Sequence, residues 1–156
     1  MAAQEGHAPC LQLLVNAKAN VDAAKDGGIS PACMAAQKGH APCLQLRTTA
    51  PRPCTWRRRR LIDAKANIDA AKDNGISPVY SAAENGHAPC LQLLVNAKAN
   101  VDAAKDNGIS PVYMAAQKGD APCLQLLIDA KVNSKANVDA AQDNGVSPVY
   151  MAAQKG

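Results

Sequence analysis

The sequence predicts an α-solenoid, an all-α fold with short β-hairpins in which hairpin–helix–turn–helix units stack into a rod. The first observation is an internal repeat: the segment that begins at Asp73 returns almost letter for letter 33 residues later at Asp106. A unit of this length cannot bury its own apolar face, so each copy must stack on a neighbour. The second observation is composition, because the chain is 47% hydrophobic but has no Phe, one Trp and three Tyr. Such small side chains suit closely packed helices.

Each unit is expected to open with a projecting β-hairpin, here called a finger. In the copy that spans residues 73–105, Asn74-Gly75 is a strong signal for a tight turn, since both residues tolerate positive φ. The flanking segment Asn67-Ile68-Asp69 and Ile76 are candidates for short extended strands.

A first helix follows the finger. Ser77 is a typical N-cap and Pro78 suits the first helical position, where a missing N–H is tolerated. We expect this helix to run from Pro78 to about Asn85 and to stop at Gly86.

A second helix is expected to begin near Pro89 and to end before Ala97-Lys98. Its apolar stripe comprises Cys90, Leu91, Leu93, Leu94 and Val95.

The run D-N-G-I-S-P-V-Y-S-A-A-E-N-G-H-A-P-C-L-Q-L-L-V-N-A-K resembles the ankyrin repeat. The resemblance covers the chain except residues 47–60 and implies a stacked array of repeats. Ser77 and Tyr80 replace the family's Thr and His, so we expect an altered hydrogen-bond link between repeats. The family's Gly at the end of the second helix is replaced in four copies. We expect these lysines to adopt a left-handed conformation that Gly would accept at little cost: Lys18, Lys65, Lys98 and Lys131.

The repeat phase predicts one array over residues 1–156, with five copies of unequal length. Residues 1–25 are a partial repeat, and residues 26–72 are a repeat with a 14-residue basic insert at 47–60. Residues 73–105 are a regular repeat. The repeat at 106–142 has four extra residues around 131–134, and that at 143–156 is truncated after its first helix. Neither end has a polar capping repeat, which favours a piece of a longer array.

The insert R-T-T-A-P-R-P-C-T-W-R-R-R-R holds all six Arg of the chain, and the remainder has 11 Lys against 13 Asp plus Glu. One interpretation is a nucleic-acid-binding segment that uses Trp56, Arg57, Arg58, Arg59 and Arg60. A second follows from the genetic code: a coding sequence for K-D-N-G-A-S-P-V-Y-M-A-A-Q-K-G, read one base late, can yield all fourteen residues. We favour this interpretation, in which the insert is a repeat opening translated out of frame. A frameshifted product without independent function is one alternative to a functional scaffold. The coding nucleotides test it directly.

Cysteine and histidine recur with the repeat. Cys10, Cys43, Cys90 and Cys123 share one repeat position, about 8–10 Å apart in a helix stack, which is too far for disulfides. We expect buried free thiols and therefore an intracellular, cytoplasmic protein. His7, His40 and His87 also share one position, before the second helix. We expect them to be structural and expect neither a metal nor another cofactor.

Nothing in the sequence predicts an enzyme, a nucleotide-binding loop or a membrane span. The resemblance implies a protein-binding scaffold whose partner is another protein, with nucleic acid as the disfavoured alternative. The implied contact positions lie on the fingers and first helices: Asp73, Asn74, Ile76, Glu84, Asn85, Asp106, Asn107, Ile109, Gln117, Lys118, Asp143, Asn144 and Val146, with Gln154 and Lys155. Ile29, Ile76, Ile109 and Val146 form an apolar row that either packs between fingers or serves as a docking strip.

Overall fold

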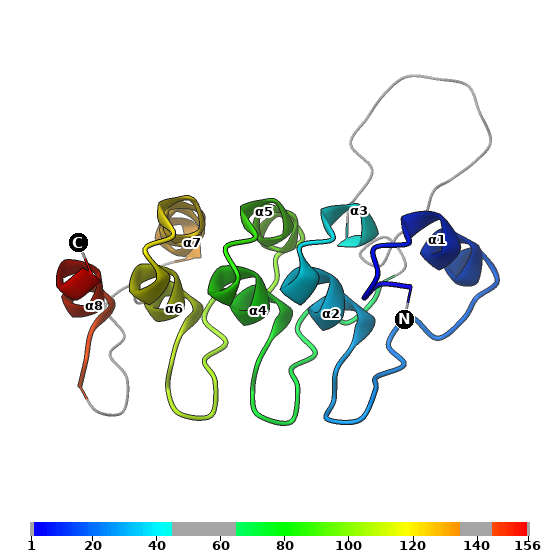
Figure 1. Cartoon of the computed structure of the whole chain (residues 1–156), viewed down its shortest axis with the longest axis horizontal. Coiled ribbons are helices and arrows are strands. Elements are labelled where there is room, and N and C mark those ends of the chain that lie inside the picture. The colour runs from blue at the N-terminus through cyan, green and yellow to red at the C-terminus, as the bar shows by residue number, and fades with distance from the viewer. Residues whose placement is uncertain (1, 45–64, 135–144, 156) are drawn as a thin grey trace, which may run out of the picture.

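A computed structural model of the chain describes residues 2–44, 65–134 and 145–155, with side chains omitted at 131–134 and 155. The described residues form eight helices in two rows (Figure 1). The first helices of the repeats make one row: α2 (Pro31–Lys38), α4 (Pro78–Glu84), α6 (Pro111–Lys118) and α8 (Pro148–Lys155). The second helices make the other row: α1 (Ala8–Asn16), α3 (Ala41–Leu44), α5 (Ala88–Asn96) and α7 (Ala121–Ser134).

The first helices begin as the Ser-Pro pairs predict. Ser77 has extended backbone angles, and its hydroxyl oxygen accepts a hydrogen bond of 3.1 Å from the Tyr80 N–H. Ser30 and Ser110 cap α2 and α6 in the same way. The cap satisfies an N–H that has no acceptor within the helix, and the following Pro needs none. The local sequence therefore determines where each first helix starts.

Small residues let the rows pack closely. Helix α2 packs on α4, α4 on α6 and α6 on α8, while α3 packs on α5 and α5 on α7. Paired alanines in the first helices are almost completely buried at these contacts: Ala35, Ala36, Ala82, Ala83, Ala115 and Ala116. The core is continuous from one repeat to the next, which is the arrangement that the 33-residue period predicts.

The fingers differ from the expected β-hairpins. Within the described residues no segment is assigned as a strand, and the only β-bridge there is antiparallel and joins Lys25 to Ile29. The segment predicted as a first strand, Asn67-Ile68-Asp69, instead makes a turn of its own, because the Asn67 side chain accepts a hydrogen bond from the Asp69 N–H at 3.1 Å. This local bond competes with extended pairing.

Two features of the fourth repeat and the first helix also differ from expectation. The four extra residues of the fourth repeat lie within α7, so Lys131 is helical instead of left-handed. Cys10 is exposed, whereas Cys43, Cys90 and Cys123 are buried as predicted. Helix α1 buries Leu11 and Val15 instead, because it lacks the partner helices that surround α5.

Candidate functional site

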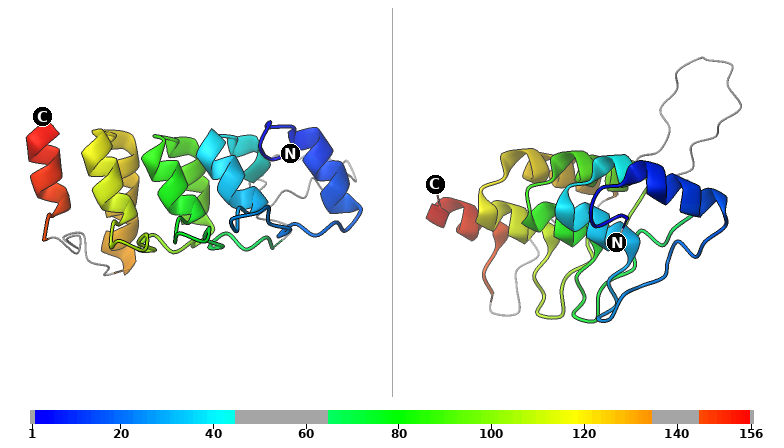
Figure 2. Two further views of the ribbon diagram at one scale, coloured as in Figure 1. Left: turned by 60° about the horizontal axis from the view of Figure 1, so that its bottom comes forward. Right: turned by 45° about the vertical axis from the view of Figure 1, so that its right-hand side comes forward.

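One side of the rod carries the fingers, as the agreeing views in Figures 1 and 2 show. We define the finger face as the fingers at residues 23–30, 70–77 and 103–110 together with the first helices α2, α4 and α6. Stacking of the first helices sets the fingers side by side at corresponding positions. The face therefore presents the same residue positions several times over.

Each finger is closed by its own hydrogen bonds. The Lys72 N–H donates to the Ile76 carbonyl oxygen at 3.0 Å, and the Gly75 N–H donates to the Lys72 carbonyl oxygen at 2.9 Å. Gly75 has φ of 76°, and a Cβ there would collide with the Asp106 side chain of the next finger. Glycine is thus required by both the turn and the close approach of its neighbour.

Neighbouring fingers also bond to one another and to the first helices. The Asp73 N–H donates to the Gly27 carbonyl oxygen at 3.2 Å. The Lys72 Nζ donates to the Gln37 Oε1 at the end of α2, at 3.0 Å. These bonds hold the finger at 70–77 against the preceding repeat, so this part of the face is preorganised.

The predicted contact residues are largely accessible. The exposed residues are Asp73, Asn74, Asn85, Asp106, Asn107, Lys118 and Gln154. Half-buried residues are Ile76, Glu84, Ile109, Gln117 and Val146. The tips and the ends of the first helices therefore carry the polar surface of the face.

Other predicted residues lie outside the described ranges: Asp143, Asn144, Trp56, Arg57, Arg58, Arg59 and Arg60. The same holds for the side chain of Lys155.

The apolar row is neither fully packed between the fingers nor fully exposed as a docking strip. Ile29, Ile76, Ile109 and Val146 are all half-buried rather than fully packed or fully exposed. The Ile76 carbonyl oxygen lies 3.8 Å from the Cys33 Sγ of the preceding repeat. The backbone of the row is thus packed against the stack while part of each side chain remains accessible.

The buried thiols behind this face are poor nucleophiles. Cys33 lies 3.4 Å from the Ser81 Oγ, and burial raises the pKa of its thiol above the ordinary value. Burial also raises the pKa of Cys90 to about 11 and that of Tyr80 to about 12. Desolvation disfavours the charged form of each group, so these groups stay neutral near pH 7.

A family model for ankyrin repeats in three copies matches residues 58–136 and, in a second match, residues 82–156. A model of the single ankyrin repeat matches residues 1–26. The chain belongs to the ankyrin-repeat family. Ankyrin repeats are generally protein–protein interaction modules, and proteins built from them are typically non-enzymatic scaffolds. A search of curated proteins finds no match to the chain.

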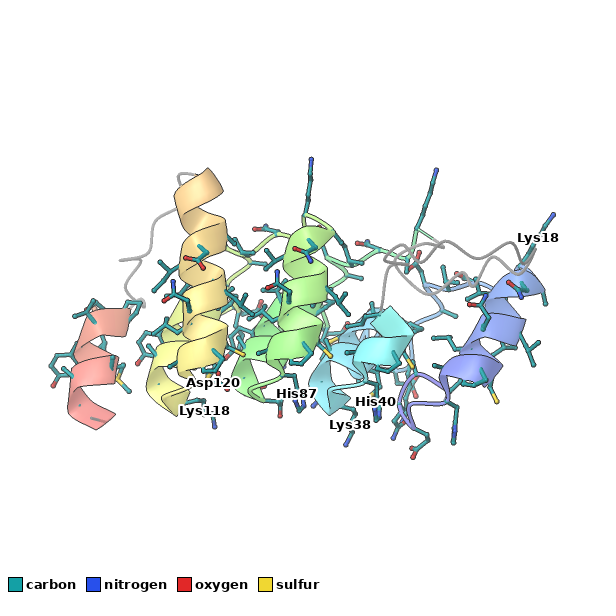
Figure 3. The ribbon with its side chains drawn as sticks, turned by 90° about the horizontal axis from the view of Figure 1, so that it is seen from above. Lys18, Lys38, His40, His87, Lys118 and Asp120 are labelled. Atoms are coloured by element: carbon teal, nitrogen blue, oxygen red, sulfur yellow. The ribbon has the colours of Figure 1, made fainter. Side chains whose placement is uncertain are left out.

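Histidine provides a link between consecutive ankyrin repeats. His40 donates from Nε2 to the Gln4 carbonyl oxygen at 2.9 Å, and His87 makes the same bond to Gln37 at 3.2 Å. Each ring also lies against a glycine of the preceding repeat. In the fourth repeat Asp120 takes this position, and Figure 3 shows it on the same edge as His40 and His87. The geometry accounts for the recurring His by structure alone.

Sequence reasoning missed a second link between the ankyrin repeats. The Asp22 Oδ1 accepts a hydrogen bond of 2.7 Å from the Asn67 N–H, and the Asp69 Oδ1 accepts one of 2.7 Å from the Asn100 N–H. These carboxylates are the equivalent residues of successive repeats. Their recurrence was the available signal, but turn-located Asp usually satisfies only its own loop.

Across residues 2–44, 65–134 and 145–155, no group of three or more His, Cys, Asp and Glu residues is arranged to hold a metal ion. No helix in those same ranges combines the length and the apolar character needed to cross a membrane.

Proposed function

We propose that the chain is a non-enzymatic protein-binding scaffold whose partner contacts the finger face. The supporting observation is the alignment of exposed polar positions from consecutive repeats on one preorganised side of the rod (Figure 1). An extended partner can meet equivalent positions on two or three repeats at once. The extended concave surfaces of solenoids bind in this manner.

The chemistry of the face indicates what the partner must offer. The finger tips carry exposed carboxylates at Asp73 and Asp106, whereas exposed ammonium groups lie at Lys38 and Lys118 on the ends of first helices. A complementary protein would place basic groups opposite the tips and acidic groups opposite the helix ends. Such rim charges contribute to the association rate and orientation more than to affinity.

The thiols support an intracellular setting for this scaffold. Four of the described cysteines are buried thiols that are not joined in disulfides: Cys33, Cys43, Cys90 and Cys123. Free thiols persist in reducing compartments. We therefore place the scaffold inside the cell.

A pair of matched double variants tests the face. Asn107→Arg with Lys118→Glu changes two exposed residues of the finger face, and Asn96→Arg with Ala121→Glu introduces the same residue types at exposed positions on second helices. Proteins cross-linked to the wild-type chain in cell extract are identified by mass spectrometry. We expect the finger-face variant to lose them and the control to retain them. The reverse result would place binding on another surface, and no specific cross-linked protein at all would remove the scaffold proposal.

A further inference from the structure

The large apolar side chains left exposed within the described residues all lie at the two ends of the rod. Leu13 and Leu14 on α1 are 69% and 51% exposed, and Val149 and Tyr150 on α8 are 66% and 60% exposed. Their interior counterparts are covered: Leu94 is 0% exposed and Tyr113 is 4% exposed. Each end therefore exposes core side chains that a neighbouring repeat covers in the interior of the rod.

The C-terminal end of the rod has an apolar hollow. It lies between α6, α7 and α8, and is lined by Val112, Ala116, Leu124, Ile128, Val149 and Ala152. In the interior, α5 packs against α2, α3 and α4, which stand in the same relation to α5 as α6, α7 and α8 do to this hollow. The hollow therefore lies where a second helix packs in the interior of the rod, and this position is called its seat below.

Helix α1 has the sequence that fits this seat. Helices α1 and α5 share all nine residues, A-P-C-L-Q-L-L-V-N. In its seat α5 buries Cys90, Leu91 and Leu94, whereas the corresponding Cys10 and Leu14 of α1 are exposed. The chain itself demonstrates how this sequence packs when three partner helices are present.

The N-terminal end shows the complementary deficit. A hollow there is bordered by Leu11, Leu14 and Val15 of α1 and by Pro31 and Met34 of α2. A first helix occupies the equivalent place in the interior, as α4 does beside α5 and α6. Helix α8 has the same sequence as α6, P-V-Y-M-A-A-Q-K, which is already packed as a first helix.

We propose that two copies of this chain associate head to tail, with α1 of one copy seated in the C-terminal hollow of the other. Helix α8 of the first copy and α1 of the second then form one complete repeat across the junction. The contact continues the interface that already joins repeats within the chain. It covers Leu14, Val149 and Tyr150, and it covers Leu13 in part, because the equivalent Leu93 is half-buried. The occupant of the hollow is thus a second copy of the chain.

Residues 2–6 must move before this contact can form, because they occupy the place that the end of α8 would take. In the isolated chain the His7 N–H donates to the Ala2 carbonyl oxygen at 2.9 Å, and Gln4 accepts from His40. Ala35 and Gln37 make the same bonds at the end of α2. Residues 2–6 therefore stand in for the last turn of a first helix.

The C-terminal segment can replace that turn with little loss. Residues 151–154 repeat the sequence M-A-A-Q of residues 1–4. The Gln154 carbonyl of the first copy would accept from His40 of the second in place of Gln4. The exchange conserves these hydrogen bonds and adds burial of Val149 and Tyr150.

The geometry of the contact is heterologous, so it leaves one free end of each kind. Association therefore proceeds beyond a dimer as concentration rises. We expect sedimentation of the full chain to show dimers and then longer species. Deletion of residues 2–6 removes the competing turn and is expected to lower the dissociation constant about tenfold, equivalent to about 1.4 kcal/mol. A chain that stays monomeric at high concentration, with and without this deletion, overturns the proposal and leaves the ends to another protein.

Blocked ends distinguish head-to-tail from symmetric association. Leu14→Asp blocks the α1 end and Val149→Asp blocks the α8 end, and both residues are exposed in the single chain. Circular dichroism checks that both variants fold. We expect each variant alone to be monomeric and their mixture to form a heterodimer that does not grow. A Val149→Asp variant that still self-associates, or a mixture that stays monomeric, overturns the head-to-tail geometry.

Discussion

Three lysines adopt a backbone conformation that suits glycine. Lys18, Lys65 and Lys98 have φ of 58°, 59° and 65°. After α5 the Lys98 N–H donates to the Val95 carbonyl oxygen at 2.9 Å and the Ala99 N–H to the Leu94 carbonyl oxygen at 3.0 Å. This pair of bonds requires a left-handed residue, which costs a non-glycine residue roughly 1–2 kcal/mol.

Lys98→Gly is therefore expected to stabilise the fold. Relief of the strain exceeds the added entropy of the unfolded chain, so the free energy of unfolding rises by about 0.5–1 kcal/mol. Urea denaturation measures the change. Lys118→Gly is the matched control at the end of α6, where the backbone is helical, and it is expected to destabilise by about 0.5–1 kcal/mol. A loss of stability for Lys98→Gly would contradict the strain argument.

Thiol reactivity is expected to separate Cys10 from the other described cysteines. Cys10 is exposed, whereas burial is the main reason that the pKa of Cys90 is raised to about 11 and that of Cys123 to about 12. Thiolate is the reactive form, so at pH 8 a maleimide should label Cys10 first and the buried thiols only after unfolding. Mass spectrometry of a Cys54→Ser background, at a concentration where the chain is monomeric, identifies the site. Equal labelling rates at Cys10 and Cys90 would refute the assigned burial.

Side-chain hydrogen bonds join elements of one repeat to those of the next. The carboxylate of Asp69 joins its turn to the next repeat through the Asn100 N–H, and His87 joins its helix to the preceding one. Local sequence predicts the helices but not these bonds, because their donors and acceptors are 31 and 50 residues apart. Stacking brings them together.

Asp69→Ala is expected to lower the free energy of unfolding by about 1 kcal/mol. A buried hydrogen bond to a charged acceptor would contribute more than this to the free energy of unfolding, but Asp69 is exposed. Thermal and urea unfolding measure the loss. Asp26→Ala, at an exposed finger position, is the control and should change stability by less than about 0.5 kcal/mol. An Asp69→Ala variant that matches this control would show that the link adds nothing to stability.

At the scale of the whole molecule, residues 47–60 separate two parts of one helix sequence. Removing them joins Leu46 to Leu61 and creates A-P-C-L-Q-L-L-I-D-A-K, which is identical to residues 121–131. The latter run begins α7 and is helical as far as Lys131. Proline inside a helix removes a backbone hydrogen bond and clashes with the preceding turn, and the deletion removes Pro51 and Pro53.

Deletion of residues 47–60 is therefore expected to improve folding and to raise Tm by about 3 °C or more. Calorimetry measures the effect, and a scrambled 14-residue insert that keeps the two prolines serves as the control. The nucleic-acid interpretation predicts instead that the deletion abolishes salt-sensitive binding to RNA or DNA. Such binding by the wild-type chain, lost on deletion, would favour that alternative.

The 33-residue period and the local capping signals predicted most features of this fold. The Ser-Pro caps predicted where the first helices begin, and three of the four lysines that replace glycine have the predicted left-handed conformation: Lys18, Lys65 and Lys98. Lys131 departs because four extra residues allow α7 to continue. Most of the predicted contact residues in the described ranges are accessible. The expected strands were not found in these ranges, and Asn67 forms a side-chain turn where the first strand was predicted.

The sequence by itself determined the repeat, the helices within it and the family, because these depend on spacings within 33 residues. Only the tertiary structure decided which of two identical helices is covered. Helices α1 and α5 have one sequence, yet α5 buries Leu94 and α1 exposes Leu14. Burial depends on the neighbours that stacking supplies, and a residue in a solenoid acquires them from other repeats rather than from its own.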